Sequence, residues 1–313
     1  MQVWATSSLG GYSAVASLDA ELRQRATATT YFHQLALGFT SYGRHRGDRV
    51  LFDKLGRMVT PLPTAGIGEL DDIPVSSFPW VQGSVITTEY ANAVEWTEKL
   101  EQYSQFPIGQ SVAMVLRQDQ IEQLDKVAFA AYNAGRVVYT PLTASSGQFS
   151  TTGSAGSVAG SAMTVAHVKD ITDYLRTNKV PPLAGGKFVA VCHADHARGI
   201  KDSSEFIQLH AYNDNDRLFD HEIGEYAGVR FLEENNALTS PAGTNSAGFA
   251  QAIYEGADNV VEAVAVAPHL RYKIPTGFGR DRGMASYAIL GFTQVWAYNT
   301  DSGEEHQVRA DSL

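Results

Sequence analysis

The chain has 313 residues, enough to bury a sizeable core in one large domain or two smaller ones. Its 24 Lys and Arg against 34 Asp and Glu give a net charge of −10, which argues against nonspecific nucleic-acid binding because phosphate neutralisation needs a basic face. The single cysteine, Cys192, excludes an intrachain disulfide, and no apolar run approaches the roughly 20 residues that cross a bilayer.

Residues 1–46 contain one candidate helix and no evident compact domain. The helix would begin near Ser17 or Asp19, with Leu22 on its buried side. The segment also lacks the basic stretch and apolar core of a secretion signal, so we expect synthesis in a cytoplasm. This composition is typical of an arm that lies across other surfaces.

Two strand patterns follow, separated by a long proline-rich segment. One begins at Gly47 in GDRVLFDKLGRMVTP, and the other at Gly83 in GSVITTEYANAVEW, where Val85 and Ile86 point to opposite faces. Structureless connections of more than about 20 residues are unusual in compact domains and usually have a function. The pattern predicts an extended, hairpin-like arm.

The strongest helix pattern is SVAMVLRQDQIEQLDKVAFAAYNAG, which starts at Ser111. Its apolar residues at helical spacing are Ile121, Leu124, Ala128 and Ala131. Gly135 is well placed to end the helix at the C′ position. About 24 residues at about 1.5 Å per residue give a rod of roughly 36 Å, a length that suits a structural spine.

The next segment, Ser145–Met163, is small, polar and glycine-rich, which predicts a flexible loop. Thr164 is the expected cap of a helix whose buried face carries Val168, Ile171 and Leu175. KFVAVCHAD predicts a buried strand, and DHARGIKDSSEFIQLHAYND one or two short helices. Near the C-terminus, VVEAVAVAPHLRYKI and ASYAILGFTQVWAYN predict two long strands. This order favours an α+β fold over a repeating βαβ fold.

The best local cluster for a metal site or a thiol nucleophile is CHADH, with Cys192, His193, Asp195 and His196. One Cys with neighbouring imidazoles matches no zinc spacing, and cysteine proteases take their His from a distant segment. We therefore favour a structural interpretation, in which Asp195 caps the following helix and Cys192 is buried.

A second candidate metal site is HEIGE, where His221 and Glu222 begin an HExx pattern. The zinc-protease pattern needs a second His where Glu225 stands, and Gly224 inside a helix costs about 1 kcal/mol relative to Ala. From Val229, VRFLEE alternates as a strand does. We expect a turn entering a strand.

Two further motifs carry little weight. GFGRDRG, residues 277–283, has GxGxxxG spacing and opens no helix, so a tight basic loop between strands is a better interpretation than a phosphate loop. The RGD tripeptide at Arg46–Asp48 is too short to indicate a cell-adhesion motif. Together with Arg44 and Arg49, it would instead face acidic partners such as the ELDD stretch, residues 69–72, of a neighbouring subunit. We predict no catalytic, cofactor-binding or metal-binding residue.

The order of these parts resembles that of the major capsid proteins of tailed bacteriophages, whose Johnson fold also occurs in the herpesvirus capsid floor. FDHEIGEYAGVRFLEENNAL is similar to a segment reading roughly G-x-Y-x-G-V-x-hydrophobic-x-E-x-N in coat proteins of podovirus-type and related phages. The matching positions are Gly224, Tyr226, Gly228, Val229 and Glu233–Asn235. QAIYEGADNVVEAVAV resembles the family's segment before the last strands, and YAILGFTQVW its closing strand. The similarity covers about residues 85–300, with GFGRDRGMAS where the family often has an Asp-Pro-Leu-Gly-like stretch.

The resemblance implies four parts. Residues 1–46 would be the N-terminal arm and 47–90 the extended loop. Residues 91–140 and 266–313 would form the peripheral domain, with the spine helix and long strands, and 141–265 the axial domain. Gly224 and Gly228 would let the backbone turn tightly into an axial strand, and Glu222 and Glu225 would be solvated or intersubunit charges.

The function implied is self-assembly, as hexamers and pentamers, into an icosahedral shell around the double-stranded DNA of a tailed phage. The chain would be synthesised and assembled in the bacterial host cytoplasm, and it would then form part of the virion. The implied partners are a scaffolding protein, a portal protein and a decoration protein. The packaged DNA would lie close by without being tightly bound, and no membrane or cofactor is implied. We expect a separate scaffolding protein and no cleavage of this chain.

Two alternatives stay open. One is an encapsulin-like shell of the same fold, which would have a cargo-peptide pocket and enclose no DNA. The other is a hydrolase that uses Cys192 and His193, or His221.

Overall fold

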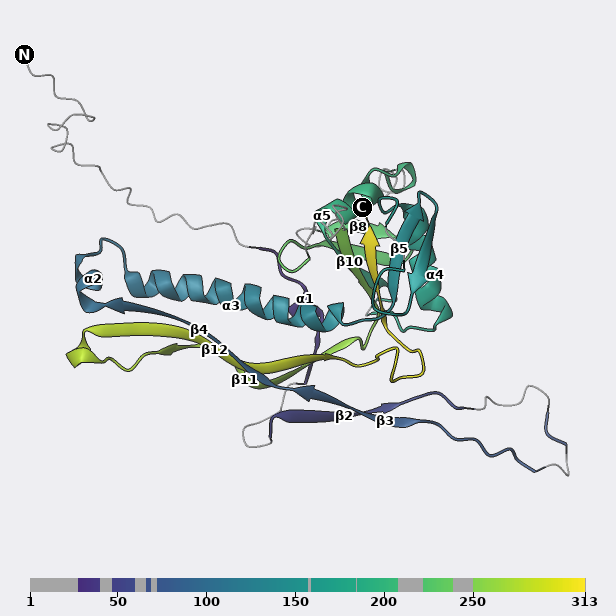
Figure 1. Ribbon diagram of the computed structural model, residues 1–313, viewed down its shortest axis with the longest axis horizontal. Coiled ribbons are helices and arrows are strands. Elements are labelled where there is room, and N and C mark those ends of the chain that lie inside the picture. The colour runs from purple at the N-terminus through teal and green to yellow at the C-terminus, as the bar shows by residue number, and fades with distance from the viewer. Residues whose placement is uncertain are drawn as a thin grey trace, which may run out of the picture.

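The computed structural model describes residues 28–39, 47–59, 66–68, 72–156, 159–183, 185–207, 222–238 and 250–312. Figure 1 shows an elongated body, a compact domain at one end of it and a two-stranded hairpin that projects past the compact domain. The helix predicted near Ser17, the arginines 44 and 46, residues 69–71 of the ELDD stretch and His221 lie outside the described residues.

The elongated body is a four-stranded sheet with a long helix along it. The strand order is β1-β11-β12-β4, with β11 and β12 antiparallel along their length. The elements are β1 (Leu37–Phe39), β4 (Thr88–Thr97), α2 (Glu98–Tyr103), α3 (Ile108–Asn133), β11 (Val260–Tyr272) and β12 (Asp281–Gln294). Leu124 of α3 packs on Ala288 and Leu290 of β12, which fixes the helix to the sheet.

Helix α3 confirms the predicted spine. It has 26 residues, slightly more than predicted, and buries Leu124 and Ala128, whereas Ile121 is 56% exposed. It ends where Gly135 is required for space, because a Cβ there would lie 1.9 Å from Gln307 Nε2. Among the described residues, no helix has the length and apolar character needed to span a membrane.

The compact domain is built on a seven-stranded mixed sheet with the order β6-β5-β13-β10-β7-β9-β8. Its strands are β5 (Val138–Thr143), β6 (Ser146–Ser150), β7 (Phe188–Cys192), β8 (Glu222–Tyr226), β9 (Val229–Glu233), β10 (Ala250–Glu255) and β13 (Gln307–Ser312). Helices α4 (Val165–Thr177) and α5 (Ala194–Lys201) cover it, and Val168, Ile171 and Leu175 of α4 are fully buried, as predicted.

The hairpin consists of β2 (Arg49–Leu55) and β3 (Trp80–Ile86), paired antiparallel from Arg49 opposite Ile86 to Leu55 opposite Trp80. This confirms the predicted hairpin-like arm. The second strand pattern is split at Thr87, whose N–H donates to Asp48 O at 2.9 Å. Before this break the chain pairs with β2, and after it β4 joins the body's sheet.

The segment before the hairpin ties the start of the described chain to the body. Helix α1 (Phe32–Leu35) buries Phe32 completely. The Phe32 ring lies 5.0 Å from that of Phe129 and 5.2 Å from that of Tyr132, both on α3. Strand β1 then pairs in parallel with β11.

Two local predictions are wrong, and a third is right in position only. The segment expected to be a flexible loop contains β6, which pairs with β5 from Ser150 opposite Val138. Thr164 is the N-cap residue of α4, but its hydroxyl donates to Ala144 O at 2.9 Å and makes no capping bond. The cap of α5 is His193, whose Nδ1 accepts from Asp195 N at 3.2 Å, so Asp195 is not the cap.

Sheet membership also differs from the predicted division of the chain. Strand β13, within the segment assigned to the peripheral domain, lies between β5 and β10 in the sheet of the compact domain. The C-terminal segment therefore crosses back from the body, and the predicted domain boundaries remain a prediction.

Candidate assembly surfaces

The hairpin presents an unusual number of apolar side chains to solvent. Those exposed on it and its connection are Leu51, Leu55, Met58, Val59, Ile67, Ile73, Val75, Phe78, Trp80 and Ile86. Val75 is 97% exposed and Ile73 80%. A two-stranded hairpin is marginally stable alone, and clustered apolar exposure marks an interaction surface. We call these ten residues the hairpin surface.

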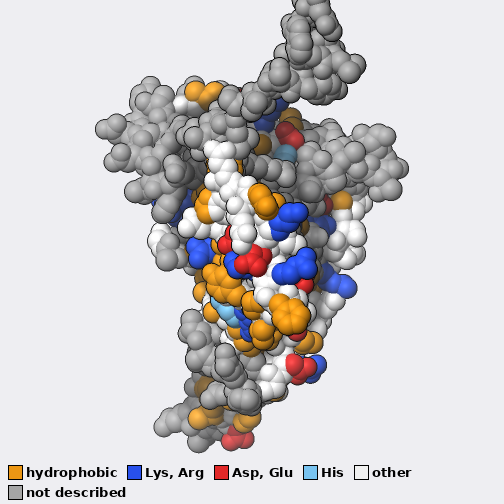
Figure 2. Space-filling model, turned by 90° about the vertical axis from the view of Figure 1, so that its left-hand side faces the viewer, with side chains coloured by type: hydrophobic (Ala, Val, Ile, Leu, Met, Phe, Trp, Pro, Cys, Tyr) orange, Lys and Arg blue, Asp and Glu red, His pale blue; other side chains and the backbone are white. Residues whose placement is uncertain are grey.

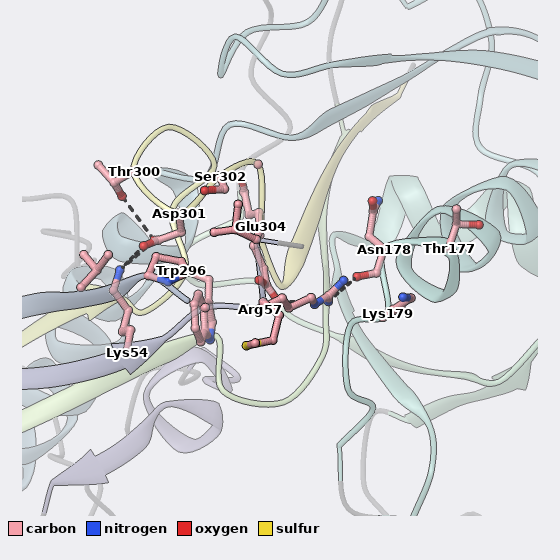
Figure 3. Close-up of a pocket in the computed structure, with 17 residues that line it drawn as sticks. Lys54, Arg57, Thr177, Asn178, Lys179, Trp296, Thr300, Asp301, Ser302 and Glu304 are labelled. Atoms are coloured by element: carbon pink, nitrogen blue, oxygen red, sulfur yellow. Dashed lines mark hydrogen bonds and ion pairs between the residues drawn. The ribbon is translucent and has the colours of Figure 1, made fainter. Parts of the chain in front are cut away.

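The root of the hairpin is buried in the body. Val85 of β3 is fully buried in a cluster with Val261 and Val295. Lys54 of β2 is 7% exposed, and its Nζ donates to Asp301 Oδ1 at 2.6 Å, to Asp301 Oδ2 at 2.7 Å and to Val295 O at 2.9 Å. Figure 3 shows this ion pair beside Trp296, whose ring centroid lies 5.6 Å from the ammonium. A buried charge needs such partners, so β2 is fixed at this point.

A cleft of about 600 Å³ lies between the hairpin root, the end of α4 and the turn after β12. Arg57 crosses it: its Nη2 donates to Asn178 O at 3.2 Å and to Glu304 Oε1 at 3.3 Å. The root thus contacts both the body and the compact domain, whereas the far part of the hairpin projects past the compact domain in Figure 1. The arrangement suits an arm with a fixed origin and a free apolar end.

The CHADH residues do not form a reactive site. Cys192 is fully buried, its Sγ–H donates to Leu232 O at 3.3 Å, and burial raises the pKa of the thiol, which disfavours the nucleophilic thiolate. His196 is buried between Ser312 Oγ (2.9 Å) and Tyr254 OH (3.1 Å), and desolvation lowers its pKa to about 3. Both groups are held neutral as part of the core.

The HEIGE stretch is one arm of a tight hairpin between β8 and β9. Tyr226 pairs with Val229 across Ala227 (φ 52°) and Gly228 (φ 83°), so the predicted glycine turn is present at Gly228, while Gly224 lies at a register shift in β8. Among the described residues, no group of three or more His, Cys, Asp and Glu could hold a metal ion.

Glu225, expected to be a solvated or intersubunit charge, has partners within the chain and keeps a side chain that is 35% exposed. It is paired with Lys187 and, at 3.3 Å, with Arg230 Nη2. The hydrogen bond from Lys187 is the main cause that lowers the pKa of this carboxyl. The side chain therefore ties β8 to β9 and to the start of β7.

The first four residues of GFGRDRG, 277–280, lie in the connection between β11 and β12, as predicted, with a single helical turn at Gly277–Gly279, whereas Asp281–Gly283 already begin β12. Sequence analysis did not find the Lys54–Asp301 pair, because its partners are 247 residues apart in the chain. The only local signal was a lysine within an alternating strand pattern.

Comparisons with known proteins agree with this geometry. The capsid of Ralstonia phage GP4 matches with a TM-score of 0.69 and 16% identity, over 99% of this chain and 98% of that one. The cyanophage Pam1 capsid matches with a TM-score of 0.70 and 14% identity, over 99% of each chain. The capsid of Helicobacter pylori bacteriophage KHP30 matches with a TM-score of 0.70 and 10% identity, over 100% of this chain and 98% of that one. These likenesses confirm the predicted capsid-protein fold.

No curated protein sequence matches this chain. The model of the family described as phage capsid protein matches residues 95–254, slightly more than half of the chain. That range runs from the end of β4 through the spine helix to β10, so it covers both the body and the compact domain. The chain belongs to the phage capsid protein family and is a major capsid protein, a subunit of the phage shell.

Proposed function

We propose that copies of this chain close into an icosahedral shell of hexamers and pentamers around the double-stranded DNA of a tailed phage. Each hairpin surface packs on the body of a neighbouring copy, and the compact domains meet around the five-fold and six-fold centres. The shell is built in the bacterial host cytoplasm with a separate scaffolding protein and a portal protein, and it becomes part of the virion.

The hairpin surface is the observation that carries this proposal. Its root is fixed by Lys54 and Val85, so the direction of the arm is defined, yet its ten apolar side chains are between about half and almost fully exposed in the described part of the chain. In a closed lattice the same contact is repeated by every subunit, so many weak contacts together hold the shell firmly.

The charge balance supports DNA as the enclosed content. A net charge of −10 per subunit gives no general attraction to phosphate, so the shell contains DNA without holding it tightly. An encapsulin-like compartment would instead enclose protein cargo. Nuclease-resistant double-stranded DNA inside particles taken from infected cells distinguishes the two.

The test is a double substitution at the end of the hairpin, Ile73→Asp with Val75→Asp. Both side chains are at least 80% exposed, so the folded subunit should keep its thermal stability. We expect loss of closed shells and of hexamer sheets in negative-stain microscopy, and a shift to slowly sedimenting subunits.

Ile121→Asp is the control, since Ile121 is an exposed apolar residue of α3, away from the hairpin. Shells formed as well by the double variant as by the wild type would refute the role of the hairpin. A wild-type chain that stays monomeric with and without scaffolding protein would refute assembly itself.

A further inference from the structure

The first described segment of the chain, residues 28–39, lies where the body meets the compact domain. Figure 1 shows α1 of this segment beside the end of α3 that is nearer to the compact domain. Phe32 is fully buried in a core cluster that joins Ala128 and Tyr132 of α3 to Val191 of β7. We call residues 28–39 the strap.

The strap makes polar contacts with three other parts of the chain. Thr29 N donates at 2.8 Å to the side-chain oxygen of Asn235, which follows β9 of the compact domain. His33 N donates to Asp125 Oδ1 of α3 at 3.1 Å, and β1 then pairs with β11. The strap therefore ties the compact domain, the spine helix and the long sheet together in one place.

An ion pair joins the strap to the long sheet. His33 Nε2 donates to Glu262 Oε1 of β11 at 2.9 Å. The Glu262 side chain is only 12% exposed, and the His33 ring lies edge-on to the ring of Phe292, with 5.7 Å between the ring centroids. Because water is partly excluded, this pair interacts more strongly than an exposed ion pair does.

His33 faces carboxyl groups from both elements that carry charge beside it. Glu262 comes from β11, and Asp125, which is fully buried, comes from α3. Glu122 lies one turn earlier on α3 and accepts a backbone N–H at the start of the strap. Glu234, buried after β9, adds a further carboxyl near Asp125. A proton on His33 therefore supplies a positive charge among acidic groups.

This environment sets the sign of a pH dependence. The hydrogen bond to Glu262 raises the pKa of His33 above its ordinary value of 6.5, with burial partly opposing the shift. Protonation therefore favours the docked strap, fully below about pH 6.5, and this contribution is lost as the pH rises through the raised pKa. Burial raises the pKa of Asp125 as well, so its ionisation also acts against docking as the pH rises.

We propose that the strap is controlled by the proton on His33: it is held tightly to the spine helix, the long sheet and the compact domain when that proton is present, and it is loosened when the proton leaves. Phe32 anchors the segment in both states, because apolar burial does not depend on pH. The change is therefore a loosening at β1, which makes the placement of the compact domain on the body adjustable.

Hydrogen exchange at the amides of β1 tests the proposal in the unassembled subunit. Each exchange rate is divided by the intrinsic rate at the same pH, which gives a protection factor. For the wild type, we expect this factor to fall about threefold or more between about pH 5.5 and about pH 8.5. Amides of β12 in the same sample report any opening of the whole subunit.

Two variants remove the ion pair from either side. His33→Gln keeps a donor for Glu262 and cannot carry a charge, so its β1 amides should be weakly protected at both pH values. Glu262→Gln removes the carboxylate, and the fall in protection should be at most half that of the wild type. His269→Gln is the matched control, because His269 is an exposed histidine of the same strand as Glu262 and should leave the wild-type fall unchanged.

The outcomes decide the proposal without reference to shell assembly. A steep fall in the wild type and in His269→Gln, with a small one in the two strap variants, establishes the control by His33. A wild type whose β1 protection does not change, or a His33→Gln variant that falls as steeply as the wild type, overturns it. If one strap variant does not fold, the other gives the same decision. A chain that forms no shell can still show this pH dependence, so the two proposals fail independently.

Discussion

At the scale of single residues, the most telling side chain is Glu255 at the end of β10. It is 2% exposed, and its Oε2 accepts from Asn259 Nδ2 at 3.2 Å. Its other oxygen has no hydrogen-bond partner in the described part of the chain. Desolvation raises the pKa of this carboxyl to about 8, with Asn259 partly opposing the shift. Glu255 is thus protonated near neutral pH, where the body joins the compact domain.

This predicts a pH dependence with a definite sign. The pKa of Glu255 is about 8 in the folded chain and 4.5 for an ordinary Glu side chain. Its protonated carboxyl therefore contributes to folding stability fully below about pH 4.5, and this contribution is lost as the pH rises through about 8. Glu255→Gln keeps an oxygen for Asn259 and cannot ionise. We expect little change near pH 4 and a gain at pH 9 that approaches at most about 5 kcal/mol, measured by urea unfolding of the subunit.

A surface carboxylate provides the opposite control. Hydrogen bonds from Lys169 and Tyr226 lower the pKa of Glu205. The contribution of this carboxylate to the free energy of unfolding is therefore present above about pH 4.5 and disappears in acid. Glu205→Gln should therefore weaken the subunit slightly at pH 7, and this effect should shrink as the pH falls below about 4.5. A gain for Glu255→Gln that is equal at pH 4 and pH 9 would contradict the assignment of the shift to Glu255.

At the scale of elements, the long periodic segments were predictable and the short polar strands were not. The spine helix was found from its length and from Leu124 and Ala128 at helical spacing, and the β11–β12 pair from two long apolar strand patterns. Strand β6 was missed because its SGQFS sequence is small and polar. Gly147 is required there, since a Cβ would lie 2.3 Å from Tyr139 Cζ on the paired strand. Strand β13 was missed for a similar reason, because QVRADS is a strand only between β5 and β10.

The candidate surfaces were predictable only in part. The proline-rich excursion after Gly47 indicated a projecting arm, and the structure has it. The root of the arm depends on Lys54 meeting Asp301, a contact that no local pattern encodes. The free end of the body likewise depends on α2 meeting the distant β11–β12 connection, where Glu98 N donates to Arg280 O, and no local pattern predicted the positive φ of Phe278.

The hairpin root yields a prediction at this scale. Asp301→Asn removes the charge that partners buried Lys54, and Asp301 also accepts from Ala297 N at 2.7 Å. Breaking a buried pair from one side typically costs about 3–5 kcal/mol. We expect a loss of that order in urea unfolding, together with faster hydrogen exchange at the amides of β2 and β3.

A double variant separates the charge from the packing. Lys54→Met with Asp301→Leu replaces both partners by apolar groups of similar size, so no unpaired charge remains buried. It should recover most of the stability lost in Asp301→Asn. Equal losses in the single and double variants would show that the ion pair is not what fixes the hairpin.

At the scale of the whole molecule, the fold leaves its apolar surfaces at the far ends of a long body. The compact domain buries its own core, whereas the hairpin surface and the free end of the body (Figure 2), which exposes Leu100, Tyr103, Tyr272, Ile274 and Phe278, project in different directions. A chain with separated contact surfaces can extend a lattice in more than one direction, which a single patch cannot do. Between these surfaces the subunit is acidic overall, so neighbouring copies repel while their apolar ends attract.

This balance predicts that salt promotes assembly. Screening shortens the Debye length from about 30 Å at 0.01 M to about 10 Å at 0.1 M, which weakens repulsion between subunits of charge −10 more than it weakens apolar contacts. The concentration at which light scattering first detects shells should fall several-fold over that range, equally in sodium and potassium chloride. Attraction between oppositely charged surfaces as the main driving force predicts the reverse, because salt would then raise the threshold. The direction of the change therefore decides whether apolar burial or ion pairing holds the shell together.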